Sequence, residues 1–348
     1  MKRSLISLFV CLSYFVAYGQ TGHFFNSSLF SSGLINRLCQ DRQGCIWIAT
    51  DYGLNSFDGY QFRSFLHNDD DTLSLVANNV VSLMCDNEGR LWVGTNKGLD
   101  RFDSDNATFI HYPFPGDVKP RVSSILQLRN GTIMVGTAGY GAYALATADD
   151  SGGERLLRWE VPESEDSQYF SFMYEDSKGR LWKSGFNERI CMYENGKAAY
   201  FNSHLGAPLG FAEISGEVIT ACLHGFMVYR DGQMQVAHVD MDHGDHADII
   251  LLRMTTDGQG NIFVGTRGQG LYRLKAGLPW RMERVELNAS GADPVTAKVS
   301  ALLIDRSQNL WLGLHRKGLL MVPQRPVQFD SWNFDEQGIR LGTRSEER

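Results

Sequence analysis

The sequence has little proline and little cysteine for its length. It contains 9 prolines and 6 cysteines among 348 residues, with no Cys-x-x-Cys pair and no dense cysteine spacing. The shortage of proline indicates few rigid linkers, and the cysteine pattern indicates that disulfides do not hold the fold together. Cys39 and Cys45 flank one predicted hairpin turn and could lie near each other, but we interpret the cysteines as packed thiols.

Positive charge and enzyme signatures are also scarce. The formal net charge is -7 and no basic stripe is visible, which excludes nucleic acid as an expected partner. The sequence contains no nucleophile elbow, phosphate loop or zinc-protease motif. The glycines around Tyr140 and Gln269 are turn glycines, because no helix is predicted after them. We therefore predict no catalytic residues and no cofactor.

Long apolar runs are absent after the first twenty residues. Residues 5–16 are almost wholly apolar, Lys2 and Arg3 precede them, and small residues stand before Gln20. This pattern predicts a signal peptide over residues 1–19. A transmembrane anchor is the alternative, but the run is short for crossing about 30 Å of hydrocarbon. We expect an exported, periplasmic protein with no direct membrane span after cleavage.

Glycine is abundant, with 36 residues, and much of it belongs to one repeated phrase. The phrase begins with alternating apolar residues and continues with Asp-x-x-Gly, an aliphatic residue, Trp, another aliphatic residue and a later Gly-Leu pair. Residues 41–54 and 86–99 are the clearest copies, and residues 176–182 are a third. In residues 257–271 Phe replaces Trp, and in residues 305–319 Gln replaces the turn glycine.

Two weaker copies open at Asn130 and Ser215. The tryptophan position is then occupied, in chain order, by Trp47, Trp92, Met134, Trp182, Ile219, Phe263 and Trp311. Their spacing is close to the about 40–45 residues of a four-stranded propeller blade. The sequence therefore predicts an all-β fold over residues 20–324, a single seven-bladed β-propeller of four-stranded antiparallel blades. We expect the large residue of the second strand to wedge between neighbouring blades.

One repeat shows the expected strands of a blade. They cover residues 80–85, 91–95, 99–102 and 108–112, and the tight turn at 86–89 joins the first two. Residues 23–26 precede the first repeat just as residues 108–112, the fourth strand of one blade, precede the next repeat. We predict that they complete blade seven as its outermost strand, although residues 327–334 compete for that place.

The most specific marks of the repeat stand in its first copy, in Asp41, Gly44, Trp47 and Gly53. Together with the linker at residues 68–75, they resemble the two-component regulator propeller repeats in the sensor half of Bacteroides-type hybrid two-component systems. The resemblance covers roughly the whole predicted propeller. It implies a periplasmic sensor that recognises a ligand.

Members of that family usually carry a second propeller, an immunoglobulin-like domain, a membrane span, a histidine kinase, a receiver and a DNA-binding module. None of these is recognisable here, and residues 325–348 are expected to be a tail or the lead-in to a second propeller. The resemblance thus implies a sensor propeller without its kinase, with a second propeller or a membrane sensor as partner.

The winding of a blade predicts which loops share a face. The turns between second and third strands (B–C turns) should lie with the linkers between blades, and the longest linkers, near residues 63–78, 201–210, 233–247 and 281–297, belong to this face. Candidate ligand contacts on these turns are Asp51, Tyr52, Asn96, Tyr140, Asn187, His224, Arg267, Gln269, His315 and Arg316. Such amide, charged and aromatic groups suit the hydroxyls and apolar ring faces of a sugar. For each of these residues taken alone, a solvated turn residue is the favoured explanation.

One linker carries a crowd of possible metal ligands: His238, Asp240, Asp242, His243, Asp245, His246 and Asp248. Their spacing matches no known metal motif, so we interpret the segment as a solvated acidic loop and predict no metal site.

Three functions remain open. The chain is a sensor propeller that responds to oligosaccharide fragments, a propeller enzyme that acts on polysaccharide as a glycosidase or lyase, or a stand-alone protein-interaction scaffold. The resemblance favours the first.

Overall fold

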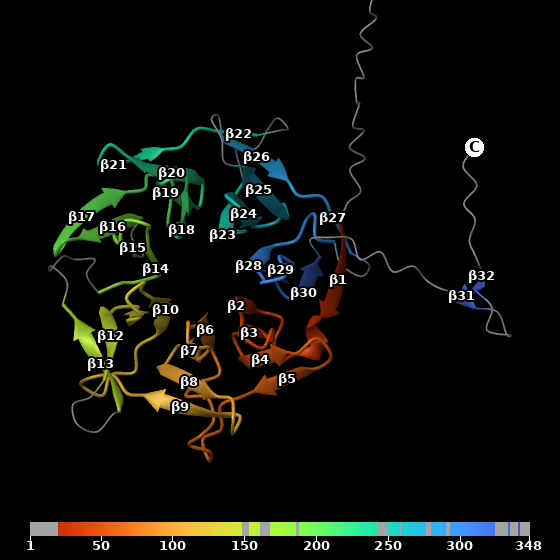
Figure 1. The fold of residues 1–348 in the computed structure, drawn as a ribbon, viewed down its shortest axis with the longest axis horizontal. Coiled ribbons are helices and arrows are strands. Elements are labelled where there is room, and N and C mark those ends of the chain that lie inside the picture. Colours follow the sequence, from red (N-terminus) through yellow and green to blue (C-terminus); the bar gives the residue numbers. More distant parts are fainter. Residues whose placement is uncertain are drawn as a thin grey trace, which may run out of the picture.

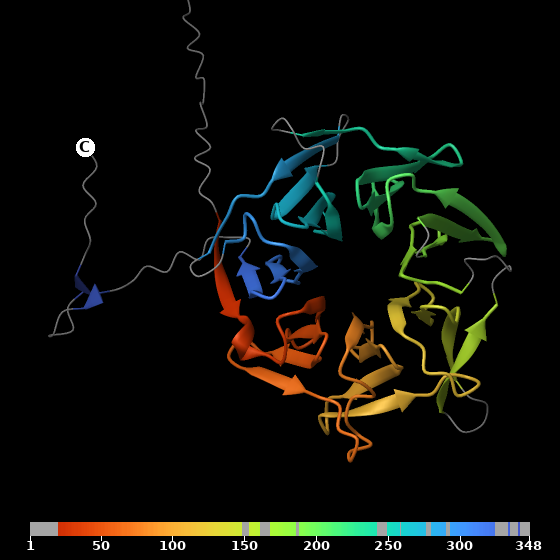
Figure 2. The same cartoon turned by 180° about the vertical axis from the view of Figure 1, so that it is seen from behind.

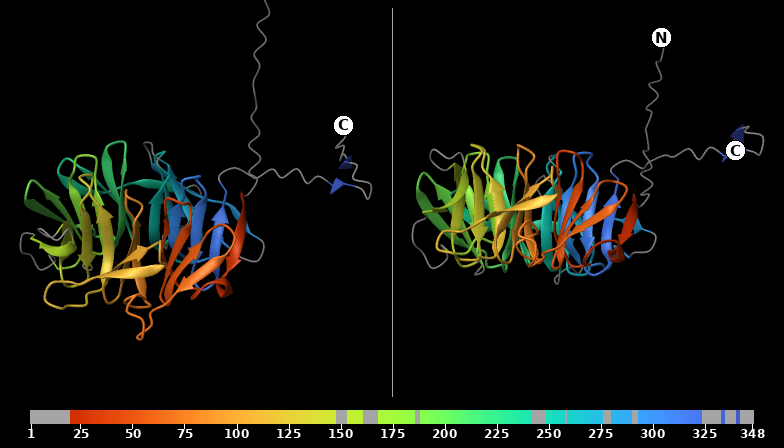
Figure 3. Two further views of the ribbon diagram at one scale, coloured as in Figure 1. Left: turned by 60° about the horizontal axis from the view of Figure 1, so that its bottom comes forward. Right: turned by 90° about the horizontal axis from the view of Figure 1, so that it is seen from below.

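Seven sheets of four or five strands stand round a common centre in the computed structural model (Figure 1). The structure describes residues 20–147, 153–160, 168–185, 188–241, 249–257, 259–275, 280–289, 293–323, 333–334 and 340–341. The sheets follow one another in chain order round the ring (Figure 2), and the ring is a shallow disc when seen from the side (Figure 3). The prediction of one seven-bladed β-propeller is confirmed.

The first four blades are regular antiparallel sheets. Blade 1 contains β2 (Ile35–Gln40), β3 (Ile46–Thr50), β4 (Gly53–Phe57) and β5 (Phe62–Phe65). Blade 2 contains β6 (Val80–Cys85), β7 (Leu91–Thr95), β8 (Leu99–Asp103) and β9 (Thr108–Tyr112). Blade 3 contains β10 (Val122–Gln127), β11 (Ile133–Thr137), β12 (Ala142–Thr147) and β13 (Glu154–Trp159). Blade 4 contains β14 (Phe172–Glu175), β15 (Leu181–Ser184), β16 (Arg189–Glu194) and β17 (Lys197–Asn202).

The remaining three blades complete the ring. Blade 5 contains β18 (Pro208–Ile214), β19 (Glu217–Cys222), β20 (Gly225–Arg230) and β21 (Gln233–Val236). Blade 6 contains β23 (Leu251–Thr256), β24 (Asn261–Thr266), β25 (Leu271–Lys275), β26 (Trp280–Arg284) and the added β22 (Val239–Met241). Blade 7 contains β28 (Val299–Ile304), β29 (Leu310–Leu314), β30 (Gly318–Val322), β1 (Gln20–Asn26) and the added β27 (Leu287–Ala289). A short 3-10 helix (Ser27–Leu29) follows β1.

Two blades depart from the predicted four antiparallel strands. β22 pairs in parallel with β26, and β27 pairs in parallel with the first residues of β1. In each case the linker that enters a blade runs along the outer edge of that blade and supplies a fifth strand. The added strand covers backbone groups that an edge strand would otherwise leave unpaired.

The ring is closed by the N-terminal strand. β1 pairs antiparallel with β30, from His23 opposite Met321 to Asn26 opposite Gly318. The predicted closure by residues 23–26 is confirmed, although β27 lies still further out beside residues 20–22. Of the competing segment only residues 333–334 are described, as β31 (Asn333–Phe334) paired with β32 (Arg340–Leu341). Residues 1–19 and 325–332 lie outside the described residues.

The repeated aspartate and tryptophan are joined by a hydrogen bond. In four blades the indole Nε1–H donates to the carboxylate six residues earlier, over 2.7 Å in Trp47–Asp41, 2.9 Å in Trp92–Asp86, 2.8 Å in Trp182–Asp176 and 2.9 Å in Trp311–Asp305. The other oxygen of Asp86 accepts the backbone N–H of Arg90 at 2.9 Å. One carboxylate therefore fixes both the first turn of the blade and the ring in its second strand.

The seven predicted wedge positions all lie in the second strand of their blades. Six of them are buried, and Phe263 is partly buried. Each belongs to a hydrophobic cluster that includes the following blade; Trp92, for example, packs with Val122 and Ile133 of blade 3. Trp311 packs with Ile35 and Ile46 of blade 1 and so closes the circle. The other five wedges contact the next blade in the same way.

Cys39 lies beside a cysteine of the neighbouring blade. The Sγ of Cys39 is 2.7 Å from the Sγ of Cys85, where the first strands of blades 1 and 2 meet. The five cysteines that the structure describes are free thiols, in agreement with their interpretation as packing residues. Within the same described part, no helix is long and apolar enough to cross a bilayer.

We expect Asp86→Ala to lower the free energy of unfolding by about 2–4 kcal/mol, because Trp92 and Arg90 lose a buried acceptor. Asp105→Ala is the matched control, since this exposed residue lies in the last turn of the same blade; it should change stability by about 0.5 kcal/mol or less. Urea unfolding measures both. Equal effects of the two substitutions would contradict the proposed role of the hydrogen bond.

Stability should also fall in acid through Asp86 and Asp176. Burial raises the pKa of each carboxyl, but hydrogen bonds from the tryptophan and the arginine outweigh it, so the net pKa lies below the ordinary value. The unfolded chain then takes up protons first, and the stabilisation is present above about pH 4 and is lost as the pH falls through the folded pKa. Urea midpoints should therefore drop between about pH 5 and about pH 2, and drop less in the Asp86→Asn, Asp176→Asn double variant.

Candidate ligand-binding face

The B–C turns and the linkers that enter each blade lie on one face. The first residue of a turn donates its backbone N–H to the carbonyl just before the first strand of the same blade, as in Asn96 to Asn79 at 2.9 Å and His315 to Lys298 at 2.9 Å. Asp51, Ala138 and Arg267 repeat this contact. The turns are therefore held against the linkers, as the winding of the blades predicts.

A buried threonine orders most of these turns. The hydroxyls of Thr50, Thr95, Thr137 and Thr266 donate to the carbonyl of the glycine that ends the turn, over 2.6–3.1 Å. At Gly53 φ is +109°, and a Cβ there would lie 2.9 Å from the carbonyl oxygen of Phe65. The glycine is thus needed for the tight turn, and the residues between threonine and glycine form the surface of the face.

Three candidate residues meet where blade 7 joins blade 1. Asp51 accepts a hydrogen bond from the hydroxyl of Ser32 at 2.5 Å. Burial lowers the pKa of His315, and Lys298 and Arg316 lower it further against the opposing effect of Asp51. The structure therefore brings Asp51, His315 and Arg316 together from turns that are 264 residues apart in the chain.

Most other candidates stand on separate blades. Tyr52 and Tyr140 are 55% and 45% exposed and are accessible to a ligand; Arg267 is also exposed. The side-chain oxygens of Asn96 and Gln269, by contrast, are buried without a hydrogen-bond partner, so they do not face solvent in this conformation. Asn187 lies outside the described residues.

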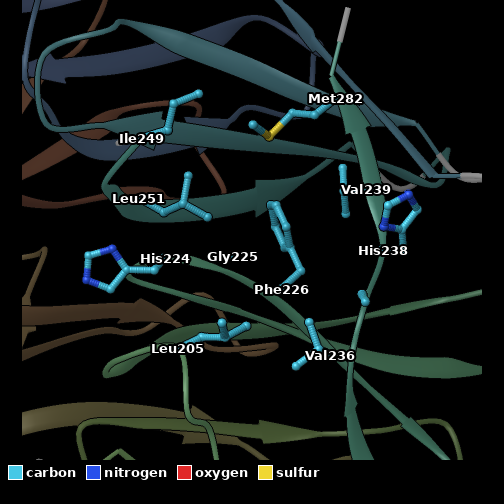
Figure 4. A pocket seen from close by; sticks show the side chains of 11 residues that line it. Leu205, His224, Gly225, Phe226, Val236, His238, Val239, Ile249, Leu251 and Met282 are labelled. Carbon is cyan, nitrogen blue, oxygen red and sulfur yellow. The ribbon is translucent and has the colours of Figure 1, made fainter. Parts of the chain in front are cut away.

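His224 borders a cavity of about 440 Å³ between blades 5 and 6 (Figure 4). Figure 4 shows His224 and His238 on opposite sides of it, with Phe226 between them. The rest of the lining is mostly aliphatic, from Leu205, Val236, Val239, Ile249, Leu251 and Met282. The sequence indicated His224 but not this apolar lining, because its residues come from strands and linkers of two blades and share no sequence motif.

The possible metal ligands of the 238–248 linker are only partly described. His238 Nε2 lies 3.3 Å from Asp240 Oδ1, whereas Asp242, His243, Asp245, His246 and Asp248 lie outside the described residues. In the part of the chain that is described, no three His, Cys, Asp or Glu side chains gather as a metal site would require.

Comparison with known families identifies the repeat. Residues 29–52 and 74–97 match the family described as two component regulator propeller. These two segments are similar to two-component regulator propeller repeats. Each matched segment runs from the entry of a blade through its first two strands to the B–C turn, in blades 1 and 2. The match therefore covers the hydrogen-bonded aspartate and tryptophan described above.

Solved structures of sensor domains have the same fold. The extracellular domain assigned to the hybrid two component system BT3049 from B. thetaiotaomicron is 16% identical, with a TM-score of 0.71 over 87% of this chain and 41% of that one. The corresponding domain of BT4673 from the same organism is 17% identical, with a TM-score of 0.71 over 89% of this chain and 44% of that one. The chain thus spans less than half the length of these domains.

The fold is shared with an enzyme as well. Virginiamycin B lyase from Staphylococcus aureus is 13% identical, with a TM-score of 0.64 over 86% of this chain and 98% of that one. At such identities these structures show the fold alone. No curated protein sequence matches this chain.

Proposed function

We propose that this chain is the ligand-recognition propeller of a periplasmic sensor in a two-component signalling system, and that it responds to oligosaccharides. The observation that carries the proposal is the match of its repeats to the two component regulator propeller family. The shared fold with extracellular domains of hybrid two component systems supports it.

The B–C turn face supports the oligosaccharide part of the proposal. Tyr52 and Tyr140 offer exposed aromatic platforms on which a sugar ring can stack. Arg267 and the group formed by Asp51, His315 and Arg316 offer donors and acceptors for hydroxyls. A rigid ring of blades that presents such side chains on short turns is the usual way in which a scaffold carries a binding surface.

Signalling by such a propeller requires a partner. A bound ligand changes the equilibrium between two arrangements of propeller and partner only by its differential affinity for them. In our proposal the partner is a second propeller or a membrane sensor, and the kinase belongs to another part of the system. The propeller recognises and the partner transmits.

We expect oligosaccharides that bind to raise the melting temperature, and we expect Tyr140→Ala with Arg267→Ala to abolish the rise. At a ligand concentration of 100 times the dissociation constant the stabilisation is about 2.7 kcal/mol, which a thermal-shift screen detects easily. The matched control is Tyr60→Ala with Arg42→Ala, which removes the same two kinds of exposed side chain from turns on the opposite face.

An unchanged response of the Tyr140, Arg267 variant would contradict the assignment of the binding face. Release of shorter sugars during incubation with polysaccharide would instead favour the enzyme alternative, and the absence of any shift across the oligosaccharide panel would favour the protein-interaction scaffold.

A further inference from the structure

The register of the sheets defines one layer of side chains round the centre of the ring. In each blade one residue of the first strand pairs with the residue two places after the wedge position. In blade order these residues are Arg37, Ser82, Ser124, Phe172, Gly210, Arg253 and Ala301. The partners of this layer, such as Ala49, stand at the end of the second strand, so the layer lies just inside the B–C turn face.

Two guanidinium groups of this layer meet over one aromatic ring. The Cζ of Arg37 in blade 1 lies 5.0 Å from the ring centroid of Phe172 in blade 4, and the Cζ of Arg253 in blade 6 lies 6.0 Å from the same centroid. Blade 4 is adjacent to neither blade 1 nor blade 6 (Figure 1). The three side chains therefore meet across the central channel.

A cavity of about 230 Å³ is lined by all three side chains. The rest of its lining consists of Asn36, Met173, Leu209, Gly210, Phe211, Met254, Ala301 and Leu302, with no carboxylate among them. Each arginine donates one Nη1 bond to a backbone carbonyl, Arg37 to Asn36 at 3.1 Å and Arg253 to Leu252 at 2.8 Å. The Nε of Arg253 is buried without a partner. The positive charge is thus uncompensated by the described surroundings.

The electrostatics agree with this geometry. Burial lowers the pKa of Arg37 well below its ordinary value, and repulsion by Arg253 and Arg121 lowers it further. Burial also lowers the pKa of Arg253 and of Arg121. The ring face of Phe172 attracts both cations, but an aromatic quadrupole compensates only part of such a charge. A group of opposite charge between the guanidinium groups would remove the repulsion.

We propose that Arg37 and Arg253, together with Phe172, form a binding site in the central channel for a single anionic group, a carboxylate or a sulfate. Guanidinium groups bind both oxyanions through paired N–H donors. Because Arg37 and Arg253 lie just inside the B–C turn face, the anion in this proposal belongs to a ligand that lies on that face. This deepens the proposed function and rests on it in one respect, that the anion is part of an acidic oligosaccharide such as one that contains a uronic acid.

The test compares glucuronate, glucose and inorganic sulfate by calorimetric titration at matched ionic strength, because screening by salt weakens such contacts. We expect glucuronate and sulfate to bind and glucose to give no signal. Arg37→Gln with Arg253→Gln should weaken binding at least about tenfold. Arg63→Gln is the matched control, since this exposed arginine of blade 1 lies on the outer strand β5, and it should bind as the wild type does.

A second variant keeps the test valid if the double glutamine variant does not fold. Arg253→Lys keeps the charge but loses the planar fork, so we expect it to weaken binding by less than the double glutamine variant. The double variant should melt no lower than the wild type, because it removes two repelling charges. Unchanged affinity in both variants, or wild-type protein that binds neither anion, would overturn the proposal.

The outcomes also separate this site from the proposed function. Binding of neutral oligosaccharides without binding of either anion would overturn the channel site and leave the sensor proposal intact. Binding of glucuronate and sulfate, dependent on the two arginines but without response to any oligosaccharide, would support the channel site and count against the sensor of oligosaccharides.

Discussion

The hydrogen bond from the second-strand tryptophan to the first-turn aspartate is the contact on which the blade repeat depends. It satisfies the indole N–H in a buried place and orients the ring, which then packs against the next blade. The same carboxylate holds the turn through the backbone N–H of Arg90. Blades 3 and 5, with Met134 and Ile219 as wedges, keep the packing without the hydrogen bond. Packing against the next blade thus requires only a large apolar side chain at the wedge position. The aspartate accepts a hydrogen bond from the wedge wherever the wedge is a tryptophan, whose indole N–H is the donor.

This internal regularity explains why the two faces of the ring differ. One face carries the first turns, whose aspartates are hydrogen-bonded to the wedge in four blades, so these aspartates have little freedom to change. Four of the B–C turns are closed by a threonine hydroxyl and a glycine, and several residues between these two, such as Tyr52, Tyr140 and Arg267, are exposed. Binding chemistry can therefore vary on the second face without loss of the fold, as is usual for loops on a rigid scaffold.

Much of the fold followed from the sequence because it depends on local pattern. The strands of blade 2 were predicted to within one residue, and the closure by residues 23–26 followed from counting strands. The parallel strands β22 and β27 did not follow, because their pairing depends on the path of long linkers. The contact of Arg37 with Phe172 and the thiol pair Cys39–Cys85 also lacked a signal. Each joins residues from different blades at positions where the copies of the repeat carry different side chains.

The closed ring limits how a bound ligand can act. Each wedge packs into the following blade, and the N-terminal strand β1 is part of blade 7, the last blade. Each blade therefore shares a hydrophobic cluster with the blade on either side, and movement of one blade would disturb both clusters. We therefore expect a ligand on the B–C turn face or in the channel to change the rigidity or the net charge of the ring and not the arrangement of its blades. In the proposed sensor, the change that the partner detects would then lie in the surface and charge of the whole propeller. Signal transfer in that proposal would proceed by rigid-body docking of the ring against its partner, an equilibrium that a single charge-neutralising anion can shift.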